Sequence, residues 1–390
     1  MSARVFFYVQ HLLGIGHLRR AATLARALAA GGFDALLVSG GAPSPGLALG
    51  AARFHQLPPV RAADARLKDL ARLDGTPLDE AFRSARVKTL LDLLHAEAPD
   101  ILVTEQFPFG RTQLRFELLP LVEAAKALRP RPLIVSSVRD VLRRSASPQR
   151  VAETVETFEP FDALLIHADP ALVRFEESFP AWAKVKERAI YTGYVAEGNP
   201  ARGRESDAGT GEVIVSTGGG AVGAPLLQAA IAARPLSVHS NRSWRLLVGP
   251  DVPAADRAGL EAARACGFIV EPARADFPTL LHNAVLSISQ AGYNTVIETI
   301  CHADRAVLVP FGTERETEQA DRARVLADRG MVAVVPPGTL SPASLADAIA
   351  RAEAGRSIRS FPPIDVNGGP ATVVVLQRLL AGQHRGLGRE

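Results

Sequence analysis

The sequence predicts an α/β chain of two doubly wound domains, each with a parallel sheet covered by helices on both faces. Short apolar runs rich in β-branched residues alternate with stretches of helical period along most of the chain. One segment, Ala196–Glu212, interrupts the alternation and is rich in Gly, Pro and charged residues, which is typical of an interdomain linker. A length of 390 residues also suits two domains better than one core.

In the first half, continuous apolar strands such as "LIVSSV" are typical of a parallel sheet buried on both faces. We expect this half to form one domain over residues 1–200. The predicted strands are Val5–Val9, Ala35–Ser39, Ile101–Thr104, Leu133–Val138 and Ala163–Ile166, with helices over Arg20–Ala30 and Leu114–Leu128.

After the linker the same alternation begins again and predicts a second domain over residues 211–365. Its strands are expected within "EVIVS", "WRLLVG", "FIVE", "AVLSIS", "AVLVPF" and "MVAVVP". The last helical stretch, residues 370–382, is expected to cross back to the first domain.

Composition excludes several classes of protein. Lys and Arg total 44 against 41 for Asp and Glu, so the formal net charge of +3 predicts no nucleic-acid partner. The two cysteines, Cys266 and Cys301, form no metal-ligand motif and fit a reducing cytoplasm. No apolar run approaches the roughly 20 residues of a membrane-spanning helix. We therefore expect a protein in the cytoplasm or peripherally attached to the inner face of the cell membrane.

In each predicted domain, one glycine-rich turn follows the first strand. In open α/β sheets, ligands bind at the carboxyl ends of strands, where helix N-termini present N–H groups to anions. The turn "LLGIGH" has Arg19 where a dinucleotide fingerprint needs a third glycine, and the second strand ends without an acidic residue. No GxxxxGK[ST] motif occurs either, so NAD and ATP are poor candidates. The first turn holds Gly14, Gly16 and His17, and the second holds Ser216, Gly218, Gly219 and Gly220.

A third junction, in "SISQAGYNTVIETICH", places a turn between an apolar strand and a helix. Gly292, Asn294 and Thr295 lie where N–H groups of a first helical turn would suit a diphosphate, and Glu298 lies near enough to bond ribose hydroxyls. The alternative from spacing alone is that Asn294 or Thr295 caps the helix, with Glu298 as the capping-box partner of Thr295.

The block from "SISQAGYN" to "EQADRARVLADRG" resembles the C-terminal donor-binding motif of family 28 glycosyltransferases. This family includes the peptidoglycan N-acetylglucosaminyltransferase and the diacylglycerol glycosyltransferases, and the resemblance implies the GT-B fold, two Rossmann-like domains facing across a cleft. It also implies that the donor is a nucleotide diphosphate sugar, most simply a UDP-sugar. The implied contacts are Gly292, Asn294, Thr295, Ser216 and Gly218–Gly220 with the diphosphate, Glu298 with the ribose, Glu318 and Gln319 with the sugar hydroxyls, and Val270 and Arg274 with the base.

Displacement at the anomeric carbon needs a base that removes the acceptor hydroxyl proton. His17 is the first candidate because it titrates near neutral pH, and Glu105 is the reserve; a helix-end histidine that bonds the backbone is the structural alternative. Helix N-termini and arginines are expected to stabilise the departing diphosphate in place of a metal, and no cofactor is expected. Residues at the carboxyl ends of first-domain strands are the candidate acceptor contacts: Gly14, Gly16, Arg111, Arg139 and Asp140, with Arg143 and Arg144 adding positive charge.

The predicted function is thus a metal-independent, inverting transfer of a hexose or N-acetylhexosamine to a carbohydrate, lipid-linked or small-molecule acceptor. Two alternatives stay open. Non-hydrolysing nucleotide-sugar 2-epimerases share this two-domain architecture and need no acceptor. A protein that binds nucleotide sugars without turnover is the other alternative.

Overall fold

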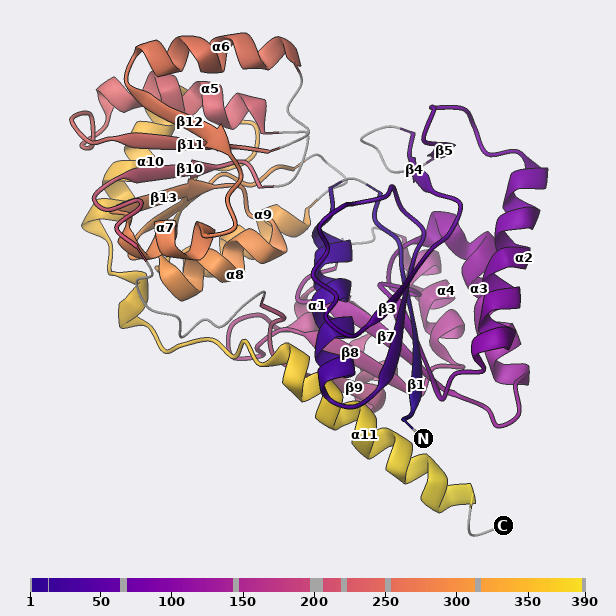
Figure 1. Cartoon of the computed structure of the whole chain (residues 1–390). Helices are drawn as coiled ribbons and strands as arrows, with labels where there is room; N and C mark the ends of the chain where they lie inside the picture. Colours follow the sequence, from indigo (N-terminus) through magenta and orange to yellow (C-terminus); the bar gives the residue numbers. More distant parts are fainter. Residues whose placement is uncertain are drawn as a thin grey trace. The chain divides into compact units, whose positions relative to one another are not determined.

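The parallel sheets that the sequence predicts are present in the computed structural model, which describes residues 2–12, 14–63, 69–142, 147–196, 206–218, 223–249, 254–312 and 317–387 (Figure 1). The chain divides into two units. Unit 1 comprises Met1–Glu197 and Asp365–Glu390, and unit 2 comprises Gly198–Ile364.

Unit 1 contains a seven-stranded sheet in the order β3-β2-β1-β6-β7-β8-β9, with every neighbouring pair parallel. A separate antiparallel pair joins β4 (Val60–Ala62) to β5 (Leu70–Arg72). The strands of the large sheet are β1 (Arg4–Val9), β2 (Asp34–Ser39), β3 (Arg53–Gln56), β6 (Ile101–Glu105), β7 (Leu133–Arg139), β8 (Ala163–His167) and β9 (Ala189–Tyr191).

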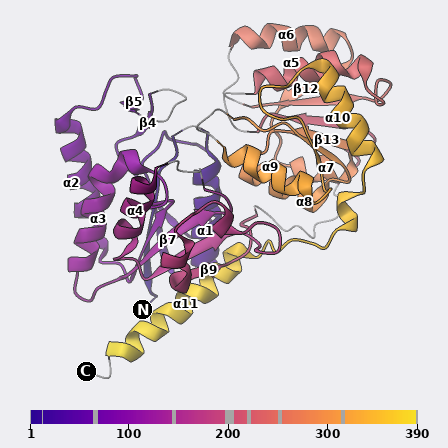
Figure 2. The same cartoon turned by 180° about the vertical axis from the view of Figure 1, so that it is seen from behind.

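Helices cover both faces of this sheet (Figures 1 and 2). On one face, α1 (Gly16–Ala30) and α11 (Gly368–Leu387) pack against the strands and against each other. Apolar residues of α1 recur at helical spacing and are buried, among them Leu18, Leu24 and Leu28. The other face carries α2 (Glu80–Glu97), α3 (Arg115–Ala127) and α4 (Pro148–Phe158), and the short helices of the unit are η1 (Thr112–Leu114), η2 (Phe175–Glu177), η3 (Trp182–Lys184) and η4 (Lys186–Arg188).

Unit 2 contains a six-stranded parallel sheet in the order β12-β11-β10-β13-β14-β15. Its core lies where α5, α6 and α10 pack on one face, and α7 and α8 lie on the other (Figures 1 and 2). Its elements are β10 (Val213–Ser216), α5 (Ala224–Ala233), η5 (Arg234–Leu236), β11 (Trp244–Val248), α6 (Ala254–Ala265), β12 (Phe268–Pro272), α7 (Phe277–Asn283), β13 (Leu286–Ser289), α8 (Tyr293–His302), β14 (Ala306–Leu308), α9 (Glu318–Asp328), β15 (Ala333–Val334), α10 (Pro342–Ala354) and η6 (Ile358–Ser360).

The prediction of strands within the apolar runs is confirmed in both halves, because each run holds one strand of the expected sheet. Helix α2 is absent from the elements that the sequence predicts. Its three buried residues are Arg86, Leu90 and Leu94, so a charged side chain occupies a core position and weakens the apolar period. The edge strands β3 and β9 were missed as well; they have half-buried or exposed side chains and weak apolar character.

Strand order reverses once in each sheet, and this defines where loops converge. In unit 1 the chain runs from β1 outward through β2 and β3, then returns to place β6 on the other side of β1. In unit 2 the corresponding reversal lies between β10 and β13. Ligands of open α/β sheets bind at such switch points, beyond the carboxyl ends of the strands. Candidate residues at these two points are His17 and Glu105 in unit 1, and Ser216 and the start of α8 in unit 2.

Candidate functional site

His17 and Glu105 meet at the switch point of unit 1. Since α1 begins at Gly16, His17 lies in its first turn, and Glu105 is the last residue of β6. His17 Nδ1 lies 2.9 Å from Glu105 Oε1, and the two side chains are 12% and 0% exposed. The two candidate bases are therefore partners, and His17 Nδ1 bonds a carboxylate instead of the backbone group of the structural alternative.

Glu105 is held on both oxygens. Arg20, one turn after His17 on α1, also contacts Oε1. The Ser137 hydroxyl lies 3.1 Å from Oε2, and Ser137 is the residue of β7 directly opposite Glu105 in the parallel register. Because a carboxylate only accepts hydrogen bonds, Arg20 and Ser137 are donors here. The carboxylate is thus fixed in orientation and fully buried.

Burial lowers the pKa of His17 well below its usual value, and the positive charges of Arg139, Arg111 and Arg20 lower it further. The imidazole is neutral at pH 7 and carries one N–H. Its Nδ1 must donate to Glu105, since the carboxylate cannot, and this leaves Nε2 with a lone pair. A neutral imidazole with a lone pair on Nε2 has the protonation state of a general base.

The candidate acceptor residues of unit 1 have different environments. Arg111, in the left-handed region at φ 60°, lies just before η1, and Arg139 ends β7; both act electrostatically on His17. Asp140 is fully buried and its Oδ1 accepts from the N–H of Val141. In the glycine-rich turn after β1, Gly14 has a φ of 61°, a conformation that favours glycine, and Gly16 is the first residue of α1. Arg143 and Arg144 lie outside the described residues.

In unit 2, the turn after β10 lies beside the N-terminus of α8. The N–H of Gly218 donates to Ser216 Oγ at 3.3 Å, and Gly218 has a φ of 65°. A Cβ on Gly218 would lie 3.5 Å from Thr295 Oγ1, so the two predicted diphosphate segments are in contact distance. Gly219 and Gly220 lie outside the described residues.

No side chain caps α8, so the capping-box alternative for this helix is wrong. Gly292 is the N-cap residue, with extended backbone and no side-chain cap bond, and Thr295 is the third helical residue. Asn294, Thr295 and Glu298 are all half-buried. The first N–H groups of a helix have no acceptor within it and favour an anion. Helix α8 thus offers this kind of end at the switch point of unit 2.

Gln319 joins the loops that follow two neighbouring strands. Its Oε1 accepts from the N–H groups of Ala291, at 3.1 Å, and Phe311, at 3.0 Å. The buried Arg322, also on α9, donates to the carbonyl of Ala291 at 2.9 Å. The carbonyl oxygen of Gln319 therefore positions the turn before α8, and its Nε2 amide is the group suited to donate to a ligand. Glu318 precedes it as the first residue of α9.

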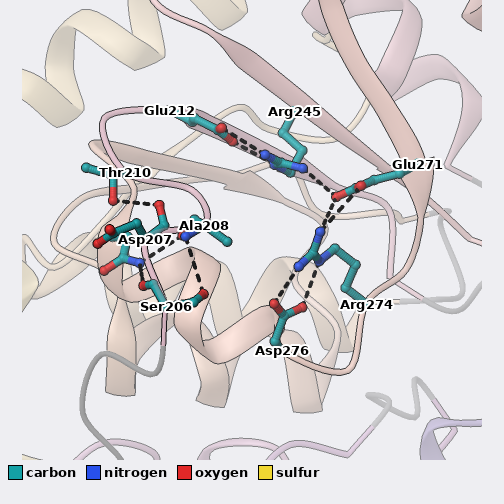
Figure 3. Close-up of polar contacts among 10 residues, drawn as sticks. Ser206, Asp207, Ala208, Thr210, Glu212, Arg245, Glu271, Arg274 and Asp276 are labelled. Atoms are coloured by element: carbon teal, nitrogen blue, oxygen red, sulfur yellow. Dashed lines mark hydrogen bonds and ion pairs between the residues drawn. The ribbon is translucent and has the colours of Figure 1, made fainter.

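Arg274 belongs to a chain of ion pairs that runs from Glu212, the residue before β10, through β11 and β12 to Asp276 at the start of α7 (Figure 3). Its guanidinium bonds Asp276 at 2.7 Å and Glu271 at 3.2 Å; Glu271 in turn bonds Arg245 at 2.7 Å. Arg245 is also bidentate to Glu212. The Arg274 side chain therefore organises the loop after β12.

Val270, the other predicted base contact, lies on the edge strand β12. Its carbonyl accepts from Arg264 Nη2 at 2.7 Å.

Four residues near His17 were missed: His11, Arg20, Ser137 and His167. Ser137 and His167 lie at the carboxyl ends of β7 and β8, the same positional signal that identified Glu105 and Arg139. His11 follows β1. Its ring packs where a side chain at position 41 would lie, because a Cβ on Gly41 would be 2.3 Å from the imidazole. A search for polar side chains at the carboxyl end of every strand would therefore find His11, Ser137 and His167. It would not find Arg20, which lies on α1.

None of the helices in the described parts of the chain combines the length and apolar character needed to cross a membrane.

A family model matches unit 2. Residues 215–358 match the glycosyltransferase family 28 C-terminal domain. A stretch of 75 residues is 39% identical to the UDP-N-acetylglucosamine–N-acetylmuramyl-(pentapeptide) pyrophosphoryl-undecaprenol N-acetylglucosamine transferase of Ralstonia nicotianae. This match covers 19% of the chain and 20% of the relative, so it spans about a fifth of that protein.

Solved structures resemble the chain over nearly its whole length. MurG of Acinetobacter baumannii has a TM-score of 0.57 at 15% identity, covering 96% of this chain and 99% of that one. CalG4, the calicheamicin glycosyltransferase, has 0.59 at 17%, with coverage of 100% and 99%. The spinosyn rhamnosyltransferase SpnG, complexed with thymidine diphosphate, has 0.58 at 16%, with 97% and 96%. At these identities the likeness shows the fold, the two Rossmann-like domains of GT-B glycosyltransferases.

Proposed function

The chain carries the C-terminal domain of glycosyltransferase family 28 within a GT-B fold, and from this premise we propose that it transfers a hexose or N-acetylhexosamine from a nucleotide diphosphate sugar to an acceptor hydroxyl. The observation that carries the proposal is the pairing of a neutral His17 with a buried Glu105 at the switch point of unit 1. This arrangement supplies the base that a glycosyl transfer requires.

His17 Nε2 takes the proton from the acceptor hydroxyl as the oxygen attacks the anomeric carbon. Glu105 keeps Nδ1 protonated and stabilises the imidazolium that forms, which favours proton transfer in a site where burial opposes a positive charge. A single displacement of this kind inverts the anomeric configuration. Glu105 itself is fully buried and acts through His17.

Unit 2 binds the donor. The N–H groups at the start of α8 and the turn at Ser216–Gly218 hold the diphosphate, and the positive end of the α8 dipole stabilises its charge as it departs. Leaving-group stabilisation by these groups needs no metal ion. Glu298 bonds the ribose hydroxyls, Glu318 and the Nε2 amide of Gln319 bond the sugar hydroxyls, and the loop that Arg274 organises contacts the base. UDP is the proposed nucleotide, since the relative from Ralstonia nicotianae is named for a UDP-sugar.

The acceptor binds unit 1 beside His17. Arg111 and Arg139 act on His17 electrostatically, so they are close enough to place positive charge at the acceptor. The Ralstonia relative is named for a pyrophosphoryl-undecaprenol acceptor, which favours a lipid-linked acceptor and a peripheral place at the inner face of the cell membrane.

A ligand screen tests donor binding directly. UDP and UDP-sugars should raise the melting temperature, because a ligand that binds only the native state stabilises it, by about 2.7 kcal/mol at 100 times its Kd. NAD and ATP should leave it unchanged. Equal stabilisation by NAD would contradict the donor assignment.

Transfer is tested by incubating the protein with UDP-sugars and an acceptor panel. We expect UDP release that depends on acceptor, persists in EDTA, and yields a product of inverted configuration by NMR. Epimerised UDP-sugar without any acceptor would instead identify a 2-epimerase. UDP binding with no turnover across the panel would identify a binding protein.

A further inference from the structure

A line of buried polar side chains continues from Glu105 away from His17. Ser137 Oγ lies 3.1 Å from Glu105 Oε2 and 2.9 Å from His167 Nε2. His167 Nδ1 lies 2.7 Å from Thr192 Oγ1. The relative exposure of Glu105, Ser137, His167 and Thr192 does not exceed 2%. These residues cross the carboxyl ends of β6, β7 and β8 and reach the residue that follows β9.

The chemistry of the groups fixes the direction of each hydrogen bond. The Glu105 carboxylate only accepts hydrogen bonds, so the single O–H of Ser137 donates to Oε2. The Ser137 oxygen must then accept from His167, which places the proton of the neutral ring on Nε2. Nδ1 of His167 consequently accepts from the Thr192 hydroxyl. Burial lowers the pKa of His167 well below its usual value, and the charge of Arg20 lowers it further, so the ring has one N–H.

We propose that His167 is a positioning residue for the transfer: by donating to Ser137 it commits the Ser137 hydroxyl to Glu105 and so holds the carboxylate toward His17. This inference rests on the proposed function of His17 as the base. His167 reaches the reacting atoms only through Ser137 and Glu105.

Glu105 needs this restraint because two donors compete for Oε1. Arg20 and His17 both bond that oxygen, and a carboxylate free to rotate would turn toward the permanently charged guanidinium. The bond from Ser137 holds Oε2 on the β7 side and fixes the plane of the carboxylate. Without His167, the Ser137 oxygen loses the donor that fixes the direction of its O–H, and the restraint on Glu105 weakens. His17 then loses the partner that keeps its proton on Nδ1.

Two isosteric variants of His167 separate positioning from packing. In His167→Gln the amide reaches the place of Nε2 and can donate to Ser137. In His167→Asn the amide reaches only the place of Nδ1, so it can bond Thr192 but not Ser137. We expect kcat to fall about 10- to 100-fold in His167→Asn and in Ser137→Ala. This is the effect of weakening or losing the hydrogen bond from Ser137 to the charged Glu105 carboxylate. His167→Gln should stay within a few-fold of the wild type, and KM for the donor should be unchanged in all three.

The double variant Ser137→Ala/His167→Asn should be no slower than Ser137→Ala, because both changes break the same connection. Equal kcat values in His167→Gln and His167→Asn, or full kcat in Ser137→Ala, would overturn the proposal.

Imidazole ¹⁵N NMR tests the connection without turnover. In the wild type, His17 should show the Nδ1–H tautomer and His167 the Nε2–H tautomer, and His17 should lose its preference in Ser137→Ala. An Nδ1–H tautomer at His167 would overturn the proposal even in an active enzyme. If the wild type transfers no sugar, the proposed function fails, while the tautomers still decide whether the connection exists.

Discussion

At the scale of single residues, His17 combines three features that a base needs: a first-turn position on α1, a carboxylate on Nδ1 and a depressed pKa. The arginines that lower the pKa belong to three elements or loops, so the property is not local to α1.

Replacement of His17 by Ala should lower kcat about 10²- to 10⁴-fold, the usual contribution of a general base. Donor affinity, which we assign to unit 2, should change little. Steady-state kinetics and calorimetric titration with UDP measure the two quantities. Arg26→Ala, a change at a half-buried position later in the same helix that removes a bond to the carbonyl of Ala48, is the control and should leave kcat unchanged. Near-full turnover in His17→Ala would return His17 to a packing role.

Replacement of Glu298 by Ala should weaken UDP binding by about 1 to 3 kcal/mol, the cost of a lost hydrogen bond to a charged group. Glu298 lies in α8 and does not cap it, so the fold should survive. Circular dichroism and calorimetric titration check both statements. Gross unfolding would show that the carboxylate is structural and remove the support for a ribose contact.

At the scale of elements, a buried ion pair joins α2 to α3 in unit 1. Arg86 and Glu117 are both fully buried, and their atoms Nη2 and Oε1 lie 3.0 Å apart. Arg86 also bonds Gln10 at 3.0 Å, and Glu117 accepts from the hydroxyl of Tyr8. A Cβ on Gly40, the residue after β2, would lie 2.1 Å from Arg86 Nη2, so the absence of a side chain there leaves room for the guanidinium. The pair therefore anchors the loops that follow β1 and β2.

Breaking this pair should be costly. Glu117→Leu leaves the Arg86 charge buried without its carboxylate and should lower the free energy of unfolding by about 3 to 5 kcal/mol. Lys88→Ala removes the exposed pair with Asp92 on the same helix, whose side chains are 76% and 63% exposed, and should cost less than about 0.5 kcal/mol. Urea unfolding measures both. Equal losses in the two variants would contradict the assigned difference in burial.

At the scale of the whole molecule, histidines kept neutral by burial make stability depend on pH. Burial lowers the pKa of His11 to about 4, with Arg111 contributing, and lowers those of His17, His167 and His302. The unfolded chain protonates these rings below about pH 6.5, whereas the folded chain does not until their lower folded pKa values are reached. Their contribution is therefore present above pH 6.5 and is lost as pH falls.

The free energy of unfolding should drop between pH 7 and pH 5, by up to about 1.4 kcal/mol for each such histidine and pH unit below 6.5. Trp182 in unit 1 and Trp244 in unit 2 are the two tryptophans, so fluorescence of a Trp244→Phe variant reports on unit 1. His11→Gln should reduce the pH slope for that unit. A slope unchanged by His11→Gln would show that other groups dominate.

Much of the fold could be predicted from the sequence because its signals are local. Short continuous apolar runs, period-3.6 patterns, glycine turns and the linker each extend over a few residues, and they were enough to predict both sheets and the strands that precede the candidate sites. The most specific part of the family resemblance is one contiguous block, and the family model covers that part of the chain. Helix α2 was not predicted because one of its buried positions is Arg86, whose partner Glu117 lies 31 residues away in the sequence.

The pairing of His17 with Glu105 was decided only by the tertiary structure. These residues are 88 positions apart, and Ser137 and His167 follow at separations of 32 and 30. Their contact depends on strand order, which places β1, β6, β7 and β8 side by side, and no local pattern encodes that order. The sequence by itself determined which side chains end the strands. The tertiary structure decided which of them touch, because burial and directed hydrogen bonds act between neighbouring strands in space.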